Sequence, residues 1–157
     1  MSTGQSNDVQ AVRSGVERAM GELCMKFSGL EITVPCAIGY FVSRDVAAGQ
    51  IIAAEAGFKA KVALFSSFFL LHTSDPTAAA RLKEFRRHAD KAESRRNGLI
   101  HSFYWPGGSP GAVRRIKMTA KPAKGLKMEF EEITPRHVEA AIEQLNKETP
   151  PMEVGGG

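Results

Sequence analysis

Apolar residues recur at helical spacing through the first two thirds of the chain, and this pattern restricts the fold more than any other feature. It predicts helical stretches over about Asp8–Phe41, Val46–Leu71 and Pro76–Tyr104. Gly29 and Pro35 should kink the first stretch or divide it into two helices in series, because proline removes a hydrogen bond and clashes with the preceding turn. Gly57 should break the second stretch. The pattern indicates a helical protein.

The pattern changes after Trp105. Pro106–Gly111 has the composition of a loop. Val113–Thr119 and Leu126–Ile133 then alternate well enough for two short strands. Thr134 and Pro135 mark the start of a last helix. The expected fold is therefore mainly α, an up-and-down helical bundle with a small C-terminal β-hairpin and a final helix.

The chain has 157 residues, a length typical of one domain with one core. We expect that domain over residues 8–149, with polar or Pro- and Gly-rich tails at 1–7 and 150–157. Cys24 and Cys36 have apolar neighbours and are interpreted as small core residues in a reducing compartment. The chain does not open like a signal peptide, and the apolar run Val62–Leu71 is too short to span a bilayer. A cytoplasmic protein without a membrane partner is expected.

An arginine interrupts the apolar stripe of the third helical stretch. The stripe follows alternating steps of three and four residues: Leu82, Phe85, Ala89, Ala92, Leu99 and Phe103. Arg96 fills the gap between Ala92 and Leu99 on the same rhythm. Because burying an unpaired charge is costly, Arg96 should have a partner or face a cleft. The alternative is an arginine whose head reaches the bundle surface.

Two further polar residues follow Arg96 on the same stretch. Asn97 and His101 are four residues apart and share a helix face. His101 lies about 140° around a straight helix from Arg96, at about 100° per residue. A bend at Gly98, or a second copy of the helix, would bring them together. Arginine binds phosphate and histidine moves protons near neutral pH, so this set suits RNA cleavage without a metal.

Other chemistries find little support. The histidines do not pair with one another, with cysteine or with carboxylates at a metal-binding spacing. A phosphate-binding glycine loop between a strand and a helix is missing, as is a serine nucleophile elbow. We therefore expect no metal and no cofactor.

The hairpin segment is strongly basic. The net charge of the chain is +4 and its pI is about 9.2, which only weakly favours an anionic partner. Arg114, Arg115 and Lys117 are candidates for contacts with RNA phosphates. The alternative is a solvated hairpin in which these cations pair across the strands with the acidic side chains Glu129, Glu131 and Glu132.

Arg96-Asn97-x-x-x-His101, followed by a serine and three aromatic residues, resembles the Arg-Asn-x-x-x-His signature of the HEPN superfamily. The resemblance covers about Phe27–Trp105, and Gly98 within the motif departs from it by lowering helicity. It implies a helical bundle that dimerises through the motif helix, with a cleft lined by both motifs. In active members, the ribose 2′-hydroxyl attacks the neighbouring phosphate without a metal. His101 would be the acid/base, Arg96 would stabilise phosphate charge, and Asn97 would orient substrate or His101.

The resemblance leads to a metal-independent endoribonuclease of toxin or defence type as the expected function. Its expected partners are RNA, a second copy of the chain, and an antitoxin or regulatory protein. Members of the superfamily also act as non-catalytic modules, so a HEPN-like RNA-binding or regulatory protein is the alternative. An unrelated helical protein, in which Arg96 and His101 are structural, is a third interpretation.

Overall fold

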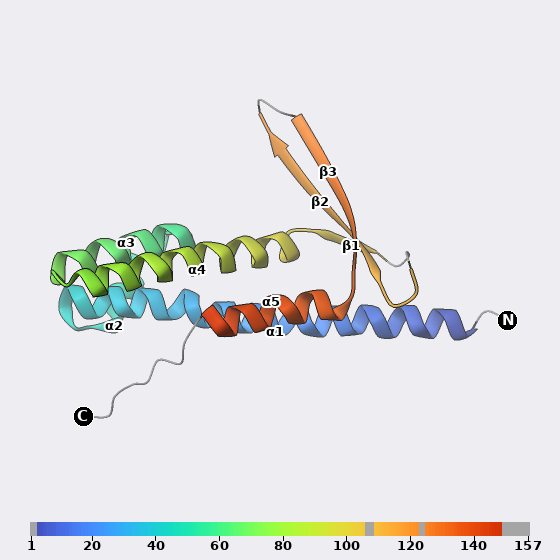
Figure 1. The fold of residues 1–157 in the computed structure, drawn as a ribbon, viewed down its shortest axis with the longest axis horizontal. Helices are drawn as coiled ribbons and strands as arrows, with labels where there is room; N and C mark the ends of the chain where they lie inside the picture. Colours follow the sequence, from blue (N-terminus) through green and yellow to red (C-terminus); the bar gives the residue numbers. More distant parts are fainter. Residues whose placement is uncertain (1–2, 106–108, 123–124, 149–157) are drawn as a thin grey trace. The chain divides into compact units, whose positions relative to one another are not determined.

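The structure is a computed structural model that describes residues 3–105, 109–122 and 125–148 (Figure 1). The helices are α1 (Thr3–Ser43), α2 (Val46–Ile52), α3 (Phe58–His72), α4 (Pro76–Ile100) and α5 (Pro135–Glu148). The strands are β1 (Phe103–Trp105), β2 (Val113–Lys121) and β3 (Gly125–Ile133). The prediction of a mainly α fold with a hairpin and a final helix is confirmed. The expected tail at 150–157 lies outside the described residues.

The chain forms two compact units. The first contains the start of α1 up to Cys24 together with Arg95–Lys147, which includes the end of α4, the sheet and most of α5. The second contains the rest of α1, then α2, α3 and α4 as far as Ser94. Both units share α1 and α4, so the boundary falls inside helices.

Helix α1 is longer and more continuous than the sequence pattern indicates. It begins at Thr3, within the segment expected to be a tail, and it runs through Gly29 and Pro35 to Ser43. The possibility of two helices in series is therefore wrong. Gln50 of α2 donates from Nε2 to the carbonyl of Ile32 at 3.3 Å, one turn before the proline. This contact shows that α2 lies directly against the proline turn.

The core of the second unit is built from α1, α3 and α4. Phe27 of α1 packs against Phe58 of α3, with ring centroids 4.8 Å apart. Phe65 of α3 contacts Phe41 of α1 at 6.1 Å and Phe85 of α4 at 5.6 Å. As predicted, a break near Gly57 divides the second stretch, and Gly57 forms the N-cap of α3. These aromatic contacts join the helices of the second unit into a bundle.

In the first unit, the three strands form one antiparallel sheet in the order β1-β2-β3. The predicted hairpin is confirmed, and its strands extend to Lys121 and from Gly125. Strand β1 corrects the sequence prediction, because α4 ends at Ile100 rather than near Tyr104. The aromatic residues after His101 pair with β2 instead, with Phe103 opposite Ile116. Pairing with a neighbouring strand replaces the last helical turn that their spacing had indicated.

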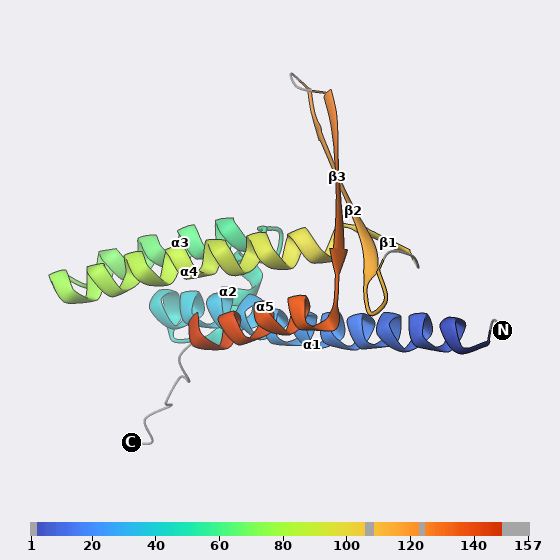
Figure 2. The same cartoon turned by 45° about the vertical axis from the view of Figure 1, so that its right-hand side comes forward.

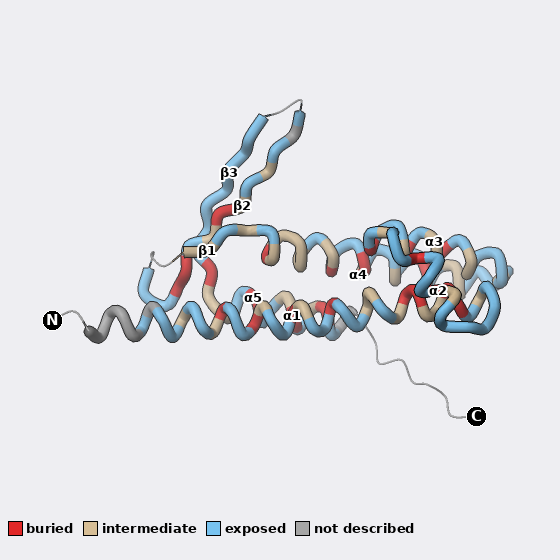
Figure 3. Tube along the Cα trace, turned by 180° about the vertical axis from the view of Figure 1, so that it is seen from behind, coloured by how far each residue is buried: buried red, intermediate tan, exposed pale blue. Residues whose placement is uncertain are grey.

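The core of the first unit lies between α1, α5 and the base of the sheet (Figure 3). Its buried apolar residues are Val16, Ala19, Leu23, Leu99, Val113, Ile133, Val138, Ile142 and Leu145, and Ile116 is buried on the opposite face of the sheet. The distal hairpin extends away from α5 (Figures 1 and 2). Cys24 and Cys36 are free thiols of intermediate burial. In the part of the chain that the structure describes, no helix has the length and apolar character needed to cross a membrane.

Candidate functional site at the end of α4

The structure joins two of the three motif residues directly. Arg96 and Asn97 lie in the last two turns of α4, and both are half-buried. Arg96 donates from Nη1 to Oδ1 of Asn97 at 2.8 Å. An arginine on the apolar stripe was expected either to have a partner or to face a cleft, and Arg96 has a partner in Asn97. This bond holds the Asn97 amide with its oxygen toward Arg96, which leaves its NH₂ group as the donor side.

His101 lies just beyond the helix rather than in it. Its backbone N–H donates to the carbonyl of Asn97 at 3.1 Å, so it continues the helical bonding by one residue. The side chain is exposed, and within the described residues its ring makes no hydrogen bond. The imidazole is thus accessible to a substrate and is tied to Asn97 only through the backbone.

Three side chains fix the end of α4 by binding carbonyls that have no partner within the helix. Ser102 Oγ donates to the Gly98 carbonyl at 2.7 Å, and Tyr104 Oη donates to the Leu99 carbonyl at 2.6 Å. Arg115 of β2 donates from Nη1 to the same Gly98 carbonyl at 3.4 Å. A cation at a helix C-terminus also interacts favourably with the helix dipole. The turn that carries His101 is therefore held from both β1 and β2.

Tyr104 is a structural donor rather than a base. Burial is the largest influence on its phenol and raises the pKa of Tyr104, although the nearby Arg115 charge acts in the opposite direction. The phenol stays protonated at neutral pH and continues to donate to the Leu99 carbonyl. Among the motif residues and the three side chains that bind the end of α4, His101 is the group suited to proton transfer.

The three basic residues predicted to contact RNA all lie opposite glutamates. Register pairs Arg114 with Glu132, Arg115 with Glu131, and Lys117 with Glu129. Arg115 Nη2 lies 2.6 Å from Glu131 Oε2, and Arg114 Nε lies 4.0 Å from Glu132 Oε1. The Arg115 side chain is only 17% exposed. The cross-strand charge pairs that the sequence left open are thus present for both arginines, and RNA contact by these residues stays a prediction.

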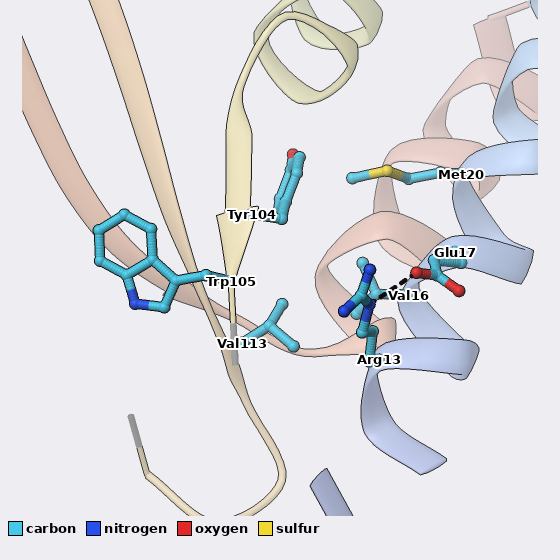
Figure 4. A pocket seen from close by; sticks show the side chains of 7 residues that line it. All are labelled: Arg13, Val16, Glu17, Met20, Tyr104, Trp105 and Val113. Atoms are coloured by element: carbon cyan, nitrogen blue, oxygen red, sulfur yellow. Dashed lines mark hydrogen bonds and ion pairs between the residues drawn. The ribbon is translucent and has the colours of Figure 1, made fainter. Parts of the chain in front are cut away.

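A small cavity in the first unit was not predicted from the sequence (Figure 4). Its volume is about 130 Å³, and its lining comes from α1, β1 and β2: Arg13, Val16, Glu17, Met20, Tyr104, Trp105 and Val113. Arg13 Nε binds Glu17 Oε1 at 2.8 Å on its wall. The cavity is smaller than the roughly 300–1,000 Å³ of most ligand pockets. The sequence shows only that Arg13 and Glu17 are four residues apart, a spacing that allows an ion pair on a helix. The cavity itself could not be predicted, because it depends on β1, and the residues of β1 fit a helical pattern in the sequence.

We predict that Gly98→Ala stabilises the site without disturbing it. Gly98 lies inside α4, and a Cβ built there meets no other group within 4 Å. Alanine should therefore raise the free energy of unfolding by about 0.5–1 kcal/mol through its higher helix propensity. Thermal unfolding of the two proteins measures this difference. A loss of stability would show that the motif needs the freedom of glycine.

No group of three or more histidine, cysteine or carboxylate side chains is placed to hold a metal ion within the described residues. Comparisons with protein-family models, with curated proteins and with solved structures found no match to this chain.

Proposed function

We propose that this protein is a metal-independent endoribonuclease of toxin or defence type, and a HEPN-like protein by its motif. The observation that carries the proposal is the end of α4, where the bonded pair Arg96–Asn97 lies beside an exposed His101. These groups supply a cation for phosphate, an amide for orientation and an imidazole for proton transfer. Ser102, Tyr104 and Arg115 hold the carbonyls of the same turn, which favours a preorganised site.

In the proposed reaction, His101 removes the proton from a ribose 2′-hydroxyl. The 2′-oxygen then attacks the adjacent phosphorus, and the bond from phosphorus to the 5′-oxygen of the next nucleotide breaks. Arg96 stabilises the negative charge that builds on the phosphate oxygens, and Asn97 orients the phosphate or His101. The products are a 2′,3′-cyclic phosphate and a 5′-hydroxyl.

The departing 5′-oxygen needs a proton from a second acid. One chain supplies one histidine at this motif, and a histidine that takes the 2′-proton lies on the opposite side of the phosphorus from the departing 5′-oxygen in an in-line displacement. A second copy of the motif across a two-fold axis would supply the acid, which is why we propose that the active form is a homodimer with adjacent motif helices. An antitoxin or regulatory protein would restrain such an enzyme by covering His101.

The first test is the product of the reaction. We expect single-stranded RNA to be cut in EDTA and to yield 2′,3′-cyclic phosphate ends. A DNA copy of the substrate should resist cleavage, because it lacks the attacking hydroxyl. Cleavage of DNA, or cleavage only after added Mg²⁺, would contradict the mechanism.

A non-catalytic HEPN-like RNA-binding or regulatory protein is the second candidate. It is favoured by the engagement of Arg96 with Asn97 and of Arg115 with Glu131, since both guanidinium groups already have partners before substrate arrives. This candidate predicts RNA binding without turnover. Binding and cleavage measured on the same RNA separate the two functions.

The role of the hairpin cations can be tested by reversing the charge of Lys117. If Lys117 contacts phosphate, Lys117→Glu should weaken RNA binding and reduce the dependence of binding on salt, because fewer counterions are released. The double variant Lys117→Glu, Glu129→Lys is a control for net charge alone, because it keeps the total charge but removes the Glu129 carboxylate that pairs with Lys127 at 2.6 Å. Equal binding by all three proteins across a salt series would make the hairpin charges structural.

A further inference from the structure

The hairpin of the first unit has an apolar face and a charged face, and beyond its base the side chains of both faces are largely exposed. Residues directly opposite in an antiparallel sheet share a face, and neighbours along a strand alternate. One face carries Trp105 and the buried Ile116 near its base, together with five large apolar side chains that are exposed: Phe103, Met118, Leu126, Met128 and Phe130. Their exposed fractions are 58%, 56%, 63%, 46% and 66%. We call this set the outer face.

The outer face points away from the start of α1. Tyr104 projects from β1 toward Met20 of α1, whereas Trp105 projects to the other side of the strand (Figure 4). Phe103 alternates with Tyr104 and so lies on the same side as Trp105. The face on the Tyr104 side carries the paired charges Arg115 and Glu131. At the base of the sheet this side also carries the core residues Val113 and Ile133. Beyond the base, the apolar side chains of the outer face lie in water, which departs from the usual alternation of buried apolar and exposed polar residues.

An exposed apolar face of this size indicates an interaction surface. Strand β3 is exposed at every position except Ile133 (Figure 3). Beyond Ile116, β2 pairs only with β3, and a two-stranded hairpin is marginally stable in water by itself. Five side chains of this size, each about half exposed, present roughly 600 Å² of surface, which approaches the ~800 Å² that each partner buries in a stable interface.

We infer that the outer face is the surface on which a second copy of this chain packs, face to face, as a two-fold sheet-on-sheet interface. Two such faces would bury about 1,200 Å² together, at the lower limit of a specific dimer. The charged residues on this face are Arg114 and Glu132, which interact with each other at its base, so that two copies bring no like charges into contact. Methionine side chains adapt easily to an identical partner surface.

A second copy fits this face better than RNA does, because phosphate binding requires cations and the one cation on this face within the described strands, Arg114, lies at its base beside Glu132. A second copy also meets the need of the proposed catalytic site for two motifs. Phe103, at one end of the outer face, follows His101 by two residues, so an interface here continues toward the motif. Only this last argument depends on the proposed function.

Analytical ultracentrifugation of the full chain tests the inference with Phe130→Glu and Met118→Glu. Both side chains are exposed in the single chain, so a glutamate should leave the fold intact, which circular dichroism can verify. Thr119→Glu is the control, because Thr119 lies beside Met118 on the opposite face of β2. At tens of micromolar we expect the wild-type protein and Thr119→Glu to sediment at twice the 17.0 kDa chain mass. The two outer-face variants should dissociate at least tenfold more readily.

A monomeric wild-type protein would overturn the inference, and flotation of that monomer with phosphatidylcholine vesicles would assign the face to a lipid surface instead. A dimer that persists in both outer-face variants would also overturn it and place the interface elsewhere. Neither result decides whether RNA is cut, since cleavage is assayed separately. Conversely, outer-face variants that become monomeric while the wild-type protein leaves RNA intact would support the interface and contradict the proposed function.

Discussion

Replacing His101 with alanine is expected to reduce RNA cleavage by about 10²–10⁴-fold, the usual contribution of a positioned acid/base group. The variant loses the proton acceptor for the 2′-hydroxyl and, in a dimer, also the donor for the leaving oxygen. The fold should be retained, because the His101 side chain is exposed and its ring makes no hydrogen bond within the described residues. A surface substitution of this kind changes the free energy of unfolding by about 0.5 kcal/mol or less.

The control is His72→Ala. His72 is also exposed, but it lies at the end of α3 in the second unit, where its ring stacks on Phe41 with centroids 5.4 Å apart. Cleavage in EDTA should be unchanged in this variant. Equal cleavage by the wild-type protein and His101→Ala would exclude His101 from the chemistry. Binding of RNA by both proteins without any cleavage would support the non-catalytic candidate.

Most of the helical architecture could be predicted because helical periodicity is a local signal. The breaks at Gly57 and before Pro76 follow from residues that do not extend a helix, and both are present. The hairpin was equally visible, since its alternation and its basic and acidic strands are properties of short segments. The segment after Ile100 was assigned wrongly for the opposite reason. Phe103 fits the helical stripe, but its pairing with Ile116 depends on a strand that comes later in the chain.

The candidate site, too, could be predicted only in part from the sequence. The identities of Arg96, Asn97 and His101 come from the sequence, but their arrangement does not. Helical geometry alone placed His101 far around the helix from Arg96, and the structure adds that α4 ends between them. The contact of Arg115 with the Gly98 carbonyl joins residues seventeen positions apart and has no local signal. The same holds for the outer face, since its exposure depends on which side of the sheet meets α1.

Replacing Gly49 with alanine should destabilise the protein strongly, although it adds only one methyl group. Gly49 is buried in α2, where it crosses α1 at Pro35 and Gly39. A Cβ at this position would overlap the carbonyl oxygen of Pro35 and the backbone nitrogen of Gly39. These are backbone atoms of a long helix, so they cannot rotate away as a flexible side chain would. We expect Gly49→Ala to lower the free energy of unfolding by about 3 kcal/mol, the upper end of the usual overpacking cost.

The proline turn of α1 makes this crossing sensitive. Pro35 has no N–H, and α2 lies against that turn through the bond from Gln50 to the Ile32 carbonyl. Moving α2 outward to admit a methyl group would therefore also strain this bond. Gly29→Ala is the control, because Gly29 lies inside α1, the helix that Gly49 crosses, and a Cβ there meets nothing within 4 Å. It should stabilise the protein by up to about 1 kcal/mol. Thermal unfolding should thus move in opposite directions for the two variants, with a decrease of about 6–12 °C for Gly49→Ala. Shifts of the same sign would show that α1 and α2 do not cross as closely as Gly39 and Gly49 indicate.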